Sequence, residues 1–163
     1  MRLPVVLTLA AVLSCPACSS GAGPGDCPVT LPSPAPTSSN GTPGPFFGRE
    51  SSHGAGSLWV GGLEPDGVIE AGADFVRPDG SISMKYGWWR GVAGKLEISG
   101  RRLDGPAAPL RSDVPDGYGD TGFQATGVYF PVEGCWEVTG RVGSARLTFV
   151  TLVTRAGATS QAR

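Results

Sequence analysis

The chain has 163 residues, a formal net charge of −1 and charged side chains at 17% of its positions. This balance excludes the basic surface that drives nucleic-acid binding, because the adjacent pair Arg101 and Arg102 cannot replace several phosphate contacts. The length fits one domain. The 26 Gly and 15 Pro favour short strands joined by tight turns, since Gly supplies positive φ and Pro fixes φ.

The N-terminus has the features of an export signal. Arg2 precedes an apolar run over residues 3–13. This run is too short to span a membrane, which takes roughly 20 residues. The following Val-Leu-Ser-Cys at residues 12–15 resembles the bacterial lipobox. This resemblance implies a signal peptide over residues 1–14, cleaved before a diacylated Cys15; the alternative is an ordinary signal peptide that releases a soluble protein.

A low-complexity tract follows the signal. Residues 15–45 are rich in Pro, Gly and Ser and carry few apolar side chains, so we expect a lipid-anchored tether. Cys15 and Cys18 also have C-x-x-C redox spacing, but they lack the strand–helix context of that motif. Asn40 begins a glycosylation sequon, for which an unmodified loop is the simpler interpretation.

From residue 46 onward, short apolar runs alternate with turn signals. Leu96 and Ile98 alternate with polar neighbours, which is typical of a half-buried strand. The regular spacing predicts an all-β domain over 46–155, a small Ig-like antiparallel β-sandwich with a small β-barrel as the alternative, and a flexible tail over 156–163. The expected strands are 57–63, 67–70, 81–86, 95–103, 123–131, 135–142 and 146–154.

Several segments resemble a group of uncharacterised bacterial exported lipoproteins that share a C-terminal GCWEVTG-type β domain. The segments on which this resemblance rests are CPVT at 27–30, MKYGWWRG at 84–91, DGYGDTGFQ at 116–124 and GCWEVTG at 134–140. The resemblance implies a recurring module without an assigned activity. The last two strands also resemble those of Ig-like sandwiches, although the domain carries Cys135 without a second core cysteine.

The remaining cysteines predict a cross-link. Disulfides persist outside the cytoplasm, and strand alternation turns Cys135 away from a core-facing Trp136. An N-terminal segment could cross there, so we expect a Cys27–Cys135 disulfide. The alternatives are a Cys18–Cys135 bond or free thiols.

Two polar groups are weak candidates for chemistry. His53 follows Ser51 and Ser52, but adjacent residues rarely form a nucleophile–base pair, so a small hydrolase is the least favoured function. The carboxylates of Asp113, Asp116 and Asp120 could bind calcium, but Asp-Gly pairs are ordinary turn formers. We expect no cofactor and no metal.

The segment Tyr86-Gly87-Trp88-Trp89-Arg90 is the strongest candidate binding surface. In an extended strand one Trp enters the core and the other faces solvent, where Tyr86, Arg90 and Trp59 could complete a platform. The alternative is that both Trp side chains cover the sandwich edge beneath Arg90.

These observations favour a non-enzymatic interaction module, held at the bacterial membrane by its lipid, that binds another envelope protein. The second hypothesis is a glycan- or cell-wall-binding module that uses Tyr86, Trp88 and Trp89.

Overall fold

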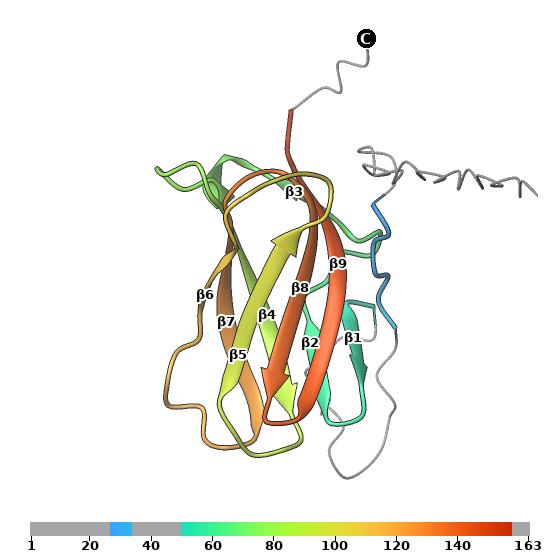
Figure 1. The fold of residues 1–163 in the computed structure, drawn as a ribbon, viewed down its shortest axis with the longest axis vertical. Helices are drawn as coiled ribbons and strands as arrows, with labels where there is room; N and C mark the ends of the chain where they lie inside the picture. The colour runs from blue at the N-terminus through green and yellow to red at the C-terminus, as the bar shows by residue number, and fades with distance from the viewer. Residues whose placement is uncertain (1–26, 34–49, 158–163) are drawn as a thin grey trace, which may run out of the picture.

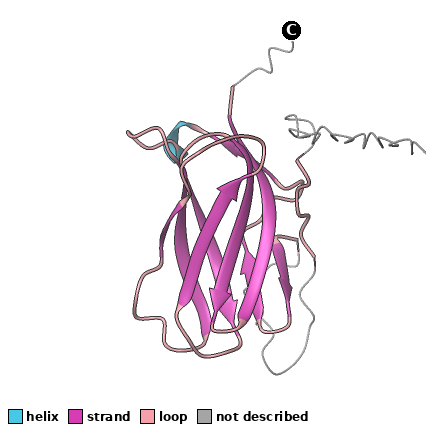
Figure 2. Ribbon diagram, viewed as in Figure 1, coloured by secondary structure: helices cyan, strands magenta, loops and turns pink. Residues whose placement is uncertain are grey.

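The structure is a computed structural model that describes residues 27–33 and 50–157. Two β-sheets pack face to face as a sandwich that does not close into a barrel (Figures 1 and 2). The first sheet has the strand order β1-β2-β4-β7-β6, and the second has the order β3-β9-β8-β5. The all-β sandwich predicted from the sequence is therefore confirmed. One pair departs from antiparallel order, because β3 runs parallel to β9.

The described residues form nine strands and one short 3-10 helix, η1. The elements, in chain order, are β1 (Ser52–Ala55), β2 (Leu58–Gly61), β3 (Val68–Ala71), η1 (Ala73–Phe75), β4 (Ile82–Arg90), β5 (Leu96–Arg102), β6 (Arg111–Asp113), β7 (Gly122–Phe130), β8 (Gly134–Val142) and β9 (Ala145–Arg155). Each of the seven expected strands has a counterpart. The short edge strands β1 and β6 were not predicted, because they lack a run of alternating apolar residues.

The core lies between the sheets and is centred on Trp88. Its indole packs against Gly140 of the opposite sheet, where an added Cβ would lie 2.4 Å from the ring. Phe149 contacts Tyr86 edge to face, with 5.3 Å between ring centres. Because Gly140 has no side chain, the large indole fits between the sheets without separating them.

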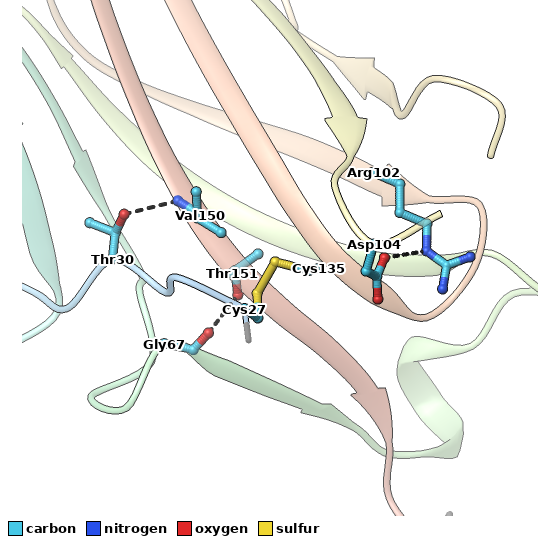
Figure 3. Close-up of a disulfide and its surroundings, with 8 residues drawn as sticks. All are labelled: Cys27, Thr30, Gly67, Arg102, Asp104, Cys135, Val150 and Thr151. Atoms are coloured by element: carbon cyan, nitrogen blue, oxygen red, sulfur yellow. Dashed lines mark hydrogen bonds and ion pairs between the residues drawn. A yellow bond between two sulfur atoms is a disulfide. The ribbon is translucent and has the colours of Figure 1, made fainter. Parts of the chain in front are cut away.

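One side of the sandwich is closed by an N-terminal strap, residues 27–33, which runs along β9 and β1 (blue in Figure 1). Cys27 forms a disulfide with Cys135 of β8 (Figure 3), as the alternation of Cys135 and Trp136 predicted. The Thr30 N–H donates to the Val150 carbonyl, and the Val150 N–H donates to the Thr30 hydroxyl. The Ser33 N–H then donates to the Ser52 carbonyl, so the strap joins the two sheets.

The opposite side is closed by β6 and the residue that precedes it. Leu110 is buried over Gly100 of β5, where a Cβ would lie 2.2 Å from the leucine side chain. The Ser112 hydroxyl donates to the Ile98 carbonyl at 3.1 Å. Both open sides of the sandwich are thus covered by the chain itself.

The folded unit differs from the expected boundaries, because the strap belongs to it although the sequence placed residues 27–33 in the tether. Cys15, the lipidation candidate, lies outside the described residues, as do Cys18, Asn40 and the expected tail from 158 onward. Within the described ranges no helix is both long and apolar enough to cross a membrane.

The Trp88–Gly140 contact makes a direct prediction for stability. Gly140→Ala should lower the free energy of unfolding by about 1–3 kcal/mol, because the added methyl overpacks a core that the buried Trp88 already fills. Urea unfolding measures the change. Gly72→Ala is the matched control, because nothing lies within 4 Å of its added Cβ. Equal stability of the two variants would contradict the proposed constraint.

Candidate functional site

The predicted platform of Tyr86, Trp88, Trp89 and Arg90 does not form. Tyr86, Trp88 and Arg90 are 3%, 0% and 3% exposed, so three of the four side chains are buried. The cause is β4, which continues to Arg90 and turns alternate residues inward. Trp89 alone points to the outer face, where it pairs across the sheet with Trp59 and Phe123.

Burial also changes the chemistry of two of these residues. Burial, with a smaller effect from the charge of Glu64, raises the pKa of the Tyr86 phenol far above its usual range, so the phenol stays neutral. Arg90 is buried without a carboxylate partner among the described residues. Its charge is balanced by main-chain dipoles instead.

Arg90 fastens two loops at one end of the sandwich. Its Nη1 donates to the carbonyls of Gly94 and Asp120, at 3.0 and 3.4 Å. Its Nη2 donates to the carbonyls of Tyr118 and Gly119, at 3.2 and 2.9 Å. The Gly94 N–H also donates to the Asp120 carbonyl. The β4–β5 and β6–β7 loops are therefore held together by one side chain.

These loops and the start of β7 expose aromatic and aliphatic side chains. The rings of Tyr118 and Phe123 meet edge to face, with 6.2 Å between centres. Tyr118 is 37% exposed, Phe123 45% and Val92 37%. We call the surface of Val92, Tyr118 and Phe123 the loop tip. The sequence analysis missed Tyr118 and Phe123, whose only signal was an aromatic residue on each side of the Gly-rich turn.

The loop tip lies far from the disulfide. Cys135 stands at the start of β8, whereas the loops follow the end of β4 and precede the start of β5. Since β5 and β8 are antiparallel, the start of β5 lies beside the end of β8. The disulfide at the start of β8 and the loop tip are thus at opposite ends of the sandwich (Figure 1).

The candidate carboxylates do not form a metal site. Asp113, Asp116 and Asp120 are exposed, and within the described ranges no three His, Cys, Asp or Glu side chains gather closely enough to hold a metal ion. Gln124 instead supports this loop, because its Nε2 donates to the Pro115 carbonyl at 2.9 Å.

His53 lies on β1 and meets a different serine from those expected. Its Nδ1 is 3.4 Å from the Ser33 hydroxyl of the strap. Ser52 is buried and accepts the Ser33 N–H through its carbonyl. The contact fastens the strap to β1.

No known protein family matches the sequence, and no curated protein is significantly similar to it.

The Arg90 bonds predict how the loop tip responds to substitution. Arg90→Met should lower the free energy of unfolding by about 1–3 kcal/mol, because each of four carbonyls loses its bond from the guanidinium. Hydrogen exchange of the Gly94 amide should become faster than in Arg146→Met, a control at an exposed position. Unchanged exchange at Gly94 would show that Arg90 does not hold the loops.

Burial lowers the pKa of His53 below its ordinary value of 6.5. A lowered pKa favours the neutral ring in the folded state, so this stabilisation is complete above 6.5 and is lost as the pH falls through the folded pKa. NMR titration of the untagged chain should give a His53 pKa below 6.5. His53→Gln should flatten the pH dependence of the free energy of unfolding between pH 6.5 and the folded pKa. An NMR-derived pKa at or above 6.5 would contradict the burial of the His53 ring.

Proposed function

We propose that this protein is a non-enzymatic interaction module of the bacterial envelope, anchored by a lipid on Cys15, that binds another envelope protein through its loop tip. The observation that carries this proposal is the exposed Tyr118–Phe123 pair, which joins the loop fastened by the buried Arg90 to the start of β7. Aromatic side chains dominate the binding energy of protein interfaces. Loops that are already ordered lose less conformational entropy on binding.

The position of the strap supports the same orientation. Cys15 lies 12 positions before Cys27, and Cys27 is bonded to Cys135 at the end opposite the loop tip. Those positions span at most roughly 40 Å when fully extended. A lipid on Cys15 would therefore hold the disulfide end near the membrane and direct the loop tip away from it.

Cross-linking in cells tests the proposal. The full-length chain should capture one envelope protein, identified by mass spectrometry, and Tyr118→Ala should reduce its recovery at least about tenfold, as loss of an interface anchor does. Val132→Ala is the matched control, because Val132 is also exposed, at 42%, but follows β7 at the disulfide end.

Recovery that is equal for the two variants would contradict the loop tip as the binding surface. Recovery of cell-wall fragments without a protein would contradict a protein partner. The intact mass of the detergent-extracted chain provides a separate check, because lipidation adds two acyl chains and a glycerol to the cleaved chain.

A further inference from the structure

A second surface lies on the outer face of the first sheet, where it begins next to the loop-tip residue Phe123. It is a groove with a volume of about 600 Å³, within the size range of small-molecule sites. Its floor is the outer face of β4 and β7, and its walls are the η1 segment and the end of β6. The proposed protein contact at Tyr118 does not use it.

Strand register creates the floor of the groove. Gly127 of β7 pairs with Lys85 of β4 on one side and with Asp113 of β6 on the other. Gly127 therefore places no side chain between the Lys85 ammonium and the Asp113 carboxylate. Ala125, the next outward residue of β7, is also small and pairs with Gly87. These small residues keep the floor low, and neighbouring aromatic side chains lie over it: the Phe123 ring at Gly87 and the Tyr129 phenol at Gly127.

Aromatic side chains line the groove. Phe75 at the end of η1 is 48% exposed, and its carbonyl accepts the Ser83 hydroxyl, which fixes this wall to β4. Tyr129 lies close to Gly127, where an added Cβ would be 3.1 Å from the phenol oxygen. The guanidinium carbons of Arg77 and Arg111 lie 5.3 and 5.5 Å from the centre of the Tyr129 ring and hold it in place.

The charged groups of the groove balance one another. Asp74 and Asp113 supply two carboxylates, whereas Arg77 and Lys85 supply two cations. A charged ligand would be attracted by one pair and repelled by the other. A neutral ligand with many hydroxyl groups fits both pairs, because a hydroxyl donates to a carboxylate and accepts from an ammonium or guanidinium group.

We propose that the groove binds a neutral saccharide chain. The sugar rings place an apolar face on Phe75, and their hydroxyls bond to Lys85, Asp113 and Asp74. Over Gly127, between Lys85 and Asp113, the Tyr129 phenol offers a further hydroxyl to the sugar.

Saturation-transfer NMR on the full-length chain in detergent tests this site. The probes are linear tetrasaccharides of N-acetylglucosamine, glucose and galactose. At least one should receive saturation, and Phe75→Ala and Gly127→Ala should each weaken its binding about tenfold. The first loses the stacking surface, and the methyl of the second displaces the Tyr129 phenol. Gly72→Ala is the matched glycine control, because its Cβ meets nothing within 4 Å. Thermal unfolding verifies that each variant folds.

Three outcomes would overturn the proposal. One is the absence of saturation transfer to all three tetrasaccharides. Another is binding that folded Phe75→Ala and Gly127→Ala retain at full strength. The third is that the groove binds an acidic peptide and none of the saccharides, and that Gly127→Ala abolishes this peptide binding. Tyr118→Ala should leave saccharide binding unchanged, which separates this site from the loop tip.

Discussion

The contact between Trp88 and Gly140 determines the placement of every side chain on the central strand. The fully buried indole fixes the inward face of β4. Because strand residues alternate, Tyr86 and Arg90 must also point inward, and Lys85 and Trp89 must point outward. The buried arginine and the open groove on the outer face are consequences of this one choice of register.

Arg90 shows how a buried charge can organise a surface without an ion pair. A guanidinium removed from water needs acceptors, and the carbonyls of the β6–β7 loop provide them. The backbone conformation of this loop is therefore determined by its bonds to the arginine and not by contact with solvent. The exposed ring of Tyr118 is therefore presented from a backbone that the interior of the sandwich positions.

The fold class, the main strands and the Cys27–Cys135 bond could be predicted, because alternation and turn residues are local signals. The binding surface could not, because the sequence analysis placed Tyr86 and Arg90 beside a solvent-facing Trp, whereas both share the inward face of Trp88. The groove depends on Gly127 standing between Lys85 and Asp113, and this register joins three strands distant in sequence.

The strap also dictates the order in which the chain can be completed. Thr30, near the N-terminus, bonds to Val150 of the last strand, and the disulfide joins residues 108 positions apart. Residues 27–33 must therefore wait for β8 and β9 to be synthesised before they can dock. Such long-range pairing slows folding. Closure of this side of the sandwich is therefore a late event in folding, because the strap docks only on a β8–β9 hairpin that is already in place.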